Sequence, residues 1–393
     1  MENRFCYILL VLMLYLGCET ETVSENTAQK YIDALQKELA PDKRVAEFQI
    51  EAYKNTDTYI LKGETNQPKG LQRLLDSLAS NSISFIDSIT VLPTAELGNK
   101  TNAIINISVA NLRSKPKHNA ELATQATLGT PVKVLKKQGD WYYIQTPDRY
   151  LAWVDAGGIV LFTEQEIKNW ESADKIIFTE TYGHAYLATD KEQIVSDLVA
   201  GNLLEVLKYS NKFYTIRFPD GRQAHVAREE SEKYDAWLAG LNSNPDVLVS
   251  TSKRFMGVPY LWGGTSTKGM DCSGFTKTIY FLNGIIIPRD ASQQVHTGKA
   301  IDDTGNFEAL EAGDLLFFVK KATETTKEKV VHVGMWIGNN EFIHASDMVR
   351  VSSVDKASKN YDDHNVNRYL RTKRILKEQD KDLIDLRQVS IFK

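Results

Sequence analysis

The chain contains few cysteines, three among 393 residues. Cys6 and Cys18 lie near the N-terminus, and Cys272 is the third. If the N-terminal segment is removed or modified, Cys272 remains as the one free thiol of the mature protein. An exported protein usually pairs its cysteines. An unpaired thiol in such a protein is therefore expected to be either deeply buried or chemically employed.

A surplus of charge of either sign is also lacking. Lys and Arg number 47, Asp and Glu number 51, and the formal net charge is −4. Nucleic-acid binding usually needs a basic face, and this balance provides no such footprint. The hydrophobic fraction of 42% and the charged fraction of 25% are ordinary for a globular protein, and the length predicts two to four domains.

The apolar run near the N-terminus is too short to span a bilayer permanently. It extends from Tyr7 to Leu16, follows Arg4, and ends just before Cys18, after which the chain becomes polar. This pattern predicts a secretory signal. The segment around Cys18 resembles a bacterial lipobox, which implies lipidation of Cys18 and anchoring to the cell envelope. A cleaved soluble secretory signal stays open as the alternative, because Tyr15 stands where the lipobox prefers Leu.

The pattern of apolar residues changes along the chain and predicts several domains. A helix–strand–strand–helix–strand order, typical of a small α+β module, is expected after a polar tether. Short alternating strands with polar turns follow in two similar copies, an internal repeat that fits small β-barrels. A third pattern is of mixed helices and strands. The predicted boundaries are 1–18 for the signal, 19–100 for the module, 101–165 and 170–235 for the barrels, and 240–375 for the last domain.

Cys272 is expected at or near the N-terminus of a helix that reads from Ser273 to Phe281. Unpaired backbone N–H groups and the helix dipole favour an anion at such a position. We therefore expect a lowered thiol pKa and a more available thiolate, with the same N–H groups able to stabilise an oxyanion. A buried structural thiol is the competing interpretation. Asp271 is a candidate substrate contact, although capping of the helix is the simpler role.

A thiol nucleophile needs a base, and His332 and His344 lie in two neighbouring predicted strands. With a two-residue loop between the strands, the two side chains point to opposite faces of the sheet. A three-residue loop or a β-bulge instead makes them diagonal neighbours on one face. We predict the second arrangement. A structural histidine is the alternative for His344, and a zinc site with Cys272 is disfavoured because paired ligand spacings are missing.

Four sequence blocks follow one another in the last predicted domain. They are Asp-Cys-Ser-Gly-Phe at 271–275, Gly-Asp-Leu-Leu-Phe-Phe at 313–318, His-Val-Gly-Met-Trp-Ile-Gly at 332–338, and Phe-Ile-His-Ala-Ser at 342–346. In this order the blocks resemble the NlpC/P60 family of cell-wall cysteine peptidases. The resemblance implies a papain-like α+β catalytic domain, with Cys272 as nucleophile, His332 as base and His344 as the residue that orients it. Other residues matched to the oxyanion and substrate regions are Tyr260, Trp262, Asp271 and Ser273. Packing is the favoured role for Trp262 and Trp336, with substrate contact as the alternative.

The two predicted barrels resemble bacterial SH3-like domains, and their order ahead of the catalytic domain resembles γ-D-glutamyl-L-diamino acid endopeptidases. This resemblance implies cleavage after γ-D-glutamate in wall-derived peptides with a free N-terminal L-Ala. It also implies that Glu121, Tyr150 and Asp290 bind the substrate amine, which suits an ammonium among carboxylates. A surface role for Glu121 and a packing role for Tyr150 are the alternatives.

The sequence thus predicts an exported multidomain α+β cysteine endopeptidase without a cofactor or metal. Its expected partners are peptidoglycan-derived peptides and, through Cys18, a membrane, and the protein is expected to be a monomer. A rival hypothesis is a hydrolase that remodels stem peptides still attached to the wall. A rival of another class is a peptidoglycan-binding lipoprotein with an idle catalytic domain.

Overall fold

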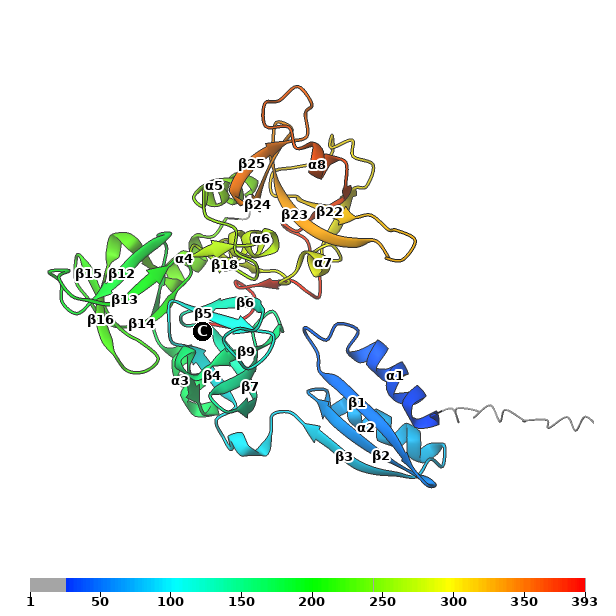
Figure 1. The fold of residues 1–393 in the computed structure, drawn as a ribbon. Helices are drawn as coiled ribbons and strands as arrows, with labels where there is room; N and C mark the ends of the chain where they lie inside the picture. The colour runs from blue at the N-terminus through cyan, green and yellow to red at the C-terminus, as the bar shows by residue number, and fades with distance from the viewer. Residues whose placement is uncertain (1–25, 243, 393) are drawn as a thin grey trace, which may run out of the picture.

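A computed structural model describes residues 26–242 and 244–392 and gives an α+β architecture (Figure 1). The predicted signal segment and Cys18 lie outside the described residues. Within the described ranges, no helix is long and apolar enough to cross a membrane.

The N-terminal module is a three-stranded sheet covered by two helices. Its elements are α1 (Thr27–Leu39), β1 (Phe48–Asn55), β2 (Thr58–Thr65), α2 (Pro68–Ser80) and β3 (Phe85–Val91). Strand β1 alternates buried and exposed residues, so Phe48, Ile50 and Ala52 face the two helices. Helix α2 forms the crossover between β2 and β3, which run parallel. The element order agrees with the sequence prediction, and the linker after β3 leads directly into the next sheet.

Two seven-stranded antiparallel sheets follow. The first contains β4 (Asn102–Ile105), β5 (Val109–Arg113), β6 (Leu122–Thr127), β7 (Pro131–Gln138), β8 (Trp141–Gln145), β9 (Leu151–Asp155) and β10 (Ile159–Phe162). Helix α3 (Glu164–Ser172) leads to the second, with β11 (Lys175–Phe178), β12 (Tyr182–Tyr186), β13 (Ile194–Val199), β14 (Leu203–Tyr209), β15 (Phe213–Arg217), β16 (Gln223–Ala227) and β17 (Ser231–Lys233). Numbered from its own first strand, each sheet has the spatial order 7-1-4-5-6-2-3. The two sheets therefore share one topology.

The C-terminal region packs helices against a six-stranded antiparallel sheet of order β21-β26-β22-β23-β24-β25. The strands are β21 (Lys299–Asp302), β22 (Leu315–Lys320), β23 (Lys329–Gly338), β24 (Glu341–Ser346), β25 (Met348–Ser353) and β26 (Tyr369–Arg374). The smaller strands are β18 (Thr265–Ser266), β19 (Gly269–Met270), β20 (Ile285–Ile286) and β27 (Ile384–Asp385). The helices are α4 (Tyr234–Gly240), α5 (Pro245–Lys253), α6 (Cys272–Phe281), α7 (Ala291–Gln294) and α8 (Asp363–Val366). Helix α6 lies in the centre of the main core, against β23 and β24.

The C-terminal segment after residue 377 packs against the rest of the protein. Strand β27 pairs with β20, and the side chains of Leu386 and Phe392 are buried among residues of the second seven-stranded sheet, α4 and β20. Apolar residues at the very end of the chain therefore join two of its domains.

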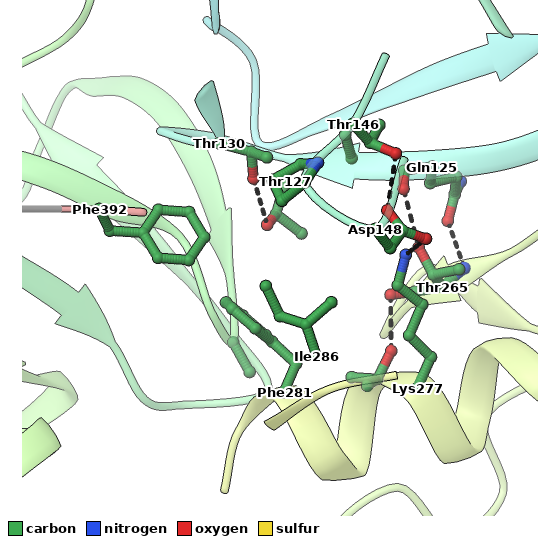
Figure 2. A pocket seen from close by; sticks show the side chains of 14 residues that line it. Gln125, Thr127, Thr130, Thr146, Asp148, Thr265, Lys277, Phe281, Ile286 and Phe392 are labelled. Atoms are coloured by element: carbon green, nitrogen blue, oxygen red, sulfur yellow. Dashed lines mark hydrogen bonds and ion pairs between the residues drawn. The ribbon is translucent and has the colours of Figure 1, made fainter. Parts of the chain in front are cut away.

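Polar contacts join the first seven-stranded sheet to the C-terminal region beside a small cavity of about 70 Å³ (Figure 2). Lys277 on α6 reaches Asp148 at 2.5 Å, and the side chain of Gln125 on β6 accepts from the backbone N–H of Thr265 at 2.9 Å. These contacts fix the position of α6 relative to Glu121 and Tyr150, which directly precede β6 and β9.

Candidate active site

Cys272 is the first residue of α6, as the sequence predicted. The preceding residue, Asp271, has extended backbone angles, and its carboxylate accepts a hydrogen bond from the Gly274 N–H at 2.7 Å. This N-cap explains why the helix begins there. Cys272 is only 7% exposed and unpaired. Its thiol lies beside β23, where the backbone of Val333, the neighbour of His332, approaches it.

The hairpin between β23 and β24 contains the predicted bulge. Asn339 and Asn340 form a two-residue turn with positive φ, and the pairing register shifts between Trp336 and Gly338. This shift moves the pairing of the following strand by one residue, so the side chains of His332 and His344 lie on the same face of the sheet. Nε2 of His332 lies 2.7 Å from Nδ1 of His344.

The second imidazole, that of His344, has polar partners of its own. Nε2 of His344 lies 3.0 Å from Oγ of Ser352 on β25 and 3.8 Å from a carboxylate oxygen of Asp362. Sequence reasoning missed both residues. Because His344 pairs with Arg350, Ser352 is a diagonal neighbour on the same face, and strand parity was the signal that could have identified it. Asp362 lies in a loop before α8, where no periodicity points to it.

The electrostatics of the resting site differ from the expected thiolate. Burial, followed by the nearby Asp271 carboxylate, raises the pKa of the Cys272 thiol to about 12. Burial likewise lowers the pKa of His332 well below its ordinary value and that of His344 to about 4. The expectation of a lowered thiol pKa was therefore wrong, because removal from water outweighs the backbone N–H groups at the helix start. At neutral pH the thiol and both imidazoles are therefore uncharged.

Tyr260 lies near the thiol and is half-buried. Burial, and then the proximity of Cys272, raises the pKa of its phenol. The group is therefore a neutral O–H donor at physiological pH, the form that can stabilise a developing oxyanion.

Asp271 and Ser273 belong to a buried network centred on Arg289. The guanidinium donates to both carboxylate oxygens of Asp271, at 3.1 and 2.6 Å, to Oγ of Ser273 at 3.0 Å, and to Oγ1 of Thr124 at 2.9 Å. Asp271 also accepts from the Gly263 N–H at 2.9 Å. Both of its oxygens are thus occupied, which favours the capping role over substrate contact. Sequence reasoning had not assigned Arg289 a role.

The three residues expected to bind an amine divide into two groups. The Tyr150 hydroxyl donates to Oδ2 of Asp290 at 3.1 Å, so these two meet across the interface between domains. Glu121 instead accepts from the indole N–H of Trp262 at 2.8 Å. Trp262 is 63% exposed, so the packing interpretation is wrong for it, whereas Trp336 is buried and stacks on Phe307.

Asp290 has a further partner that the sequence did not indicate. Arg44, in the loop between α1 and β1, contacts Oδ2 of Asp290 at 2.6 Å. No group of three or more His, Cys, Asp or Glu side chains in residues 26–242 and 244–392 is arranged to hold a metal ion.

Comparison with known proteins identifies the family. The sequence profile of the NlpC/P60 family matches residues 257–371, and that of the bacterial SH3 domain matches residues 108–160. The matched regions contain Cys272, His332 and His344 in the first case and strands β5 to β9 in the second.

Full-length relatives extend this match beyond single domains. The chain is 33% identical over 231 residues to a γ-D-glutamyl-L-lysine dipeptidyl-peptidase of Bacillus cereus, covering 57% of this chain and 67% of that protein. It is 28% identical over 268 residues to a dipeptidyl-peptidase 6 of Lysinibacillus sphaericus, covering 65% and 92%. A crystal structure of an NlpC/P60 family protein from Bacillus cereus superposes with a TM-score of 0.60 at 27% identity, covering 70% of this chain and 99% of the other. The chain belongs to the NlpC/P60 family of cysteine peptidases.

Proposed function

We propose that the protein hydrolyses the γ-D-glutamyl–L-diamino acid bond of peptidoglycan-derived peptides that carry a free N-terminal L-Ala. The observation that carries the proposal is the 2.7 Å contact between His332 and His344 on the strand pair beside Cys272. The name of the Bacillus cereus relative, a γ-D-glutamyl-L-lysine dipeptidyl-peptidase, supports the bond, and the name dipeptidyl-peptidase 6 of the Lysinibacillus relative supports release of a dipeptide.

In the proposed reaction, the Cys272 sulfur attacks the γ-glutamyl carbonyl while Nδ1 of His332 takes the thiol proton. This requires Nε2–H of His332 to donate to Nδ1 of His344, whose own Nε2–H then faces Ser352. The neutral state of both rings suits this role, because only a neutral imidazole can accept a proton. The first N–H groups of α6 and the Tyr260 hydroxyl stabilise the oxyanion.

Collapse of the tetrahedral intermediate breaks the C–N bond, and His332 returns the proton to the leaving amine of the diamino acid. The remaining thioester is hydrolysed when His332 takes a proton from water, which restores the thiol and releases the γ-D-glutamyl product. Neither half of this cycle needs a cofactor.

We assign recognition of the substrate amine to Tyr150 and Asp290, with Glu121 contributing from beside Trp262. The Asp290 carboxylate is partly buried and receives the Tyr150 hydroxyl, so it presents a shielded negative charge to a cation. Blocking the N-terminal amine of the peptide is therefore expected to reduce kcat/KM strongly.

The rest of the chain supports a multidomain enzyme of the cell envelope. The shared strand order of the two seven-stranded sheets supports a second SH3-like domain at 170–235. We further propose lipidation at Cys18, export to the cell envelope and a monomeric state.

The test compares two substrates under identical conditions. Purified protein is incubated with free L-Ala-γ-D-Glu-diaminopimelate and with intact sacculi, and products are identified by mass spectrometry. Release of L-Ala-γ-D-Glu from the free tripeptide alone supports the proposal. Cleavage of sacculi with no cleavage of the tripeptide would instead establish wall remodelling and overturn it.

A further inference from the structure

The N-terminal module sends one loop into the region assigned to the substrate amine. This loop, residues 41–46, connects α1 to β1 and is followed by the first strand of the module's own sheet. In Figure 1 it extends from the module towards the first seven-stranded sheet. The module thus reaches the candidate active site although its own core lies elsewhere.

The loop is held at defined points on either side of the site. The Leu151 N–H donates to the Arg44 carbonyl at 2.7 Å, and the Gln145 side chain donates to the Val45 carbonyl at 3.0 Å. Gln293 of α7 donates to Asp42 at 2.8 Å. One anchor is therefore next in sequence to Tyr150, and another is three residues from Asp290.

Arg44 is directed by this framework onto Asp290. Its guanidinium donates to Oδ2 of Asp290 at 2.6 Å and to Oγ of Ser292 at 3.0 Å. The same guanidinium also donates to the carboxylate of Asp42, from Nε at 2.8 Å and from Nη2 at 2.7 Å. The oxygen of Asp290 that Arg44 contacts is also the one that receives the Tyr150 hydroxyl.

An ammonium that binds Asp290 draws on the same negative charge, and Arg44 and Tyr150 already occupy one of the two carboxylate oxygens. Arg44 already balances that charge, so an incoming cation has to displace the guanidinium or share the carboxylate with it. Room for displacement exists, because the Arg44 side chain is 35% exposed and faces an open hollow lined also by Asp42, Ser292 and Gln293. A flexible side chain can move into this hollow without unfolding the loop.

We propose that Arg44 is a built-in competitor for the N-terminal ammonium of the peptide, so that the N-terminal module sets how strongly the enzyme binds and selects free-amine substrates. This inference rests on the proposed function, since it takes Asp290 as the amine-binding group. Arg44 acts here as a specificity-determining residue and takes no part in bond cleavage.

The test compares Arg44→Gln with Lys43→Gln in the full-length protein. Both variants remove one positive charge from the same loop, but Lys43 has no ion pair with Asp290. For the free-amine tripeptide, Arg44→Gln is expected to lower KM at least threefold with little change in kcat. The kcat/KM ratio of the free-amine over the N-acetylated tripeptide is expected to rise. Lys43→Gln is expected to leave both quantities within twofold of the wild type. A KM that stays constant or rises in Arg44→Gln, with both variants folded by thermal unfolding, overturns the proposal.

A second readout separates this inference from the proposed function. The rate of Cys272 modification is measured with a cationic and with a neutral methanethiosulfonate. Arg44→Gln, but not Lys43→Gln, is expected to increase the cationic rate relative to the neutral rate, because the uncovered Asp290 attracts the cation. If no protein variant cleaves the tripeptide but this ratio rises, the proposed substrate is wrong and the exposed anion is real. If the ratio does not change, the role of Arg44 is refuted whatever the substrate is.

Discussion

Two groups of polar residues near Cys272 are built in opposite ways. The first, the imidazole end, consists of His332, His344 and Ser352 from three consecutive strands, and both of its imidazoles are neutral. The second, the charged end, consists of Asp271, Arg289, Asp290, Tyr150 and Arg44. The charged end is assembled from three parts of the chain that are separated by more than a hundred residues.

This difference separates chemistry from selection. The imidazole end needs only the register of three consecutive strands, so its geometry is fixed as soon as the sheet forms. The charged end is complete only when the N-terminal module, the first seven-stranded sheet and the C-terminal region dock against one another. We infer that the proton-transfer machinery is inherited with the catalytic fold, whereas substrate preference depends on docked domains.

Replacing the thiol between the two ends is expected to have the largest effect. Cys272→Ala removes the proposed nucleophile and should lower kcat for the tripeptide by about 10⁴-fold or more. The small side chain fits the same buried space, so the thermal unfolding temperature should change little, and this serves as the control for folding. Turnover near the wild-type rate in this variant would refute the nucleophile assignment, whereas an inactive wild type would favour an idle binding protein.

Breaking the buried ion pair of the charged end should lower the free energy of unfolding strongly. Arg289→Met leaves Asp271 buried without its cation and is expected to cost about 3–5 kcal/mol of unfolding free energy, measured by urea denaturation. Arg149→Met is the matched control, because it breaks an ion pair with Asp382 in which the Arg149 side chain is 61% exposed. That change should cost less than about 1 kcal/mol. An equal loss of unfolding free energy in Arg289→Met and Arg149→Met would contradict the expectation that the buried ion pair contributes more than the exposed one.

The sequence allowed much of the imidazole end to be predicted, because the relevant information is local. Cys272 at a helix start follows from the helical stretch predicted from Ser273, and the bulge follows from strand parity between His332 and His344. Much of the charged end could not be predicted in this way. Arg44 meets Asp290 only through docking of the N-terminal module, and Arg289 pairs with Asp271 across a segment that no helical or strand period connects. The prediction of a lowered thiol pKa was wrong for the same reason, since burial of Cys272 in the completed fold raises that pKa.

Lowering the pH should act on the imidazole end. Burial places the pKa of His344 at about 4 and that of His332 well below its ordinary value, while an unfolded histidine titrates near about 6.5. Between these pH values the unfolded chain binds more protons than the folded chain. The free energy of unfolding therefore has its full value above about pH 6.5 and decreases as the pH falls towards 4. Between about pH 6.5 and 4.5 the His344 imidazole contributes on the order of 2–3 kcal/mol to this loss, and His332 adds to it in the same direction.

The measurement is urea denaturation at pH 7 and pH 4.5 for the wild type and for His344→Gln. The variant is expected to lose less stability between the two values, because one of the two titrating groups is gone. The acid limb of kcat/KM in the wild type should likewise lie below pH 6.5, since His332 remains neutral there. An acid limb centred at or above 6.5 would show that His332 is not shielded in the working enzyme.

The smallest expected effect lies at the exposed border of the charged end and tests whether Glu121 belongs to it. Trp262→Phe keeps the aromatic ring but removes the N–H that holds Glu121 at 2.8 Å. A single exposed hydrogen bond contributes on the order of 0.5–1.5 kcal/mol, so KM for the free-amine tripeptide should rise roughly two- to tenfold with kcat unchanged. The same variant should show no change with the N-acetylated tripeptide, because that substrate offers no ammonium for Glu121 to bind. A fall in kcat with both substrates would instead connect Trp262 to the thiol and remove Glu121 from the amine site, leaving Asp290 and Tyr150 alone to recognise the cation.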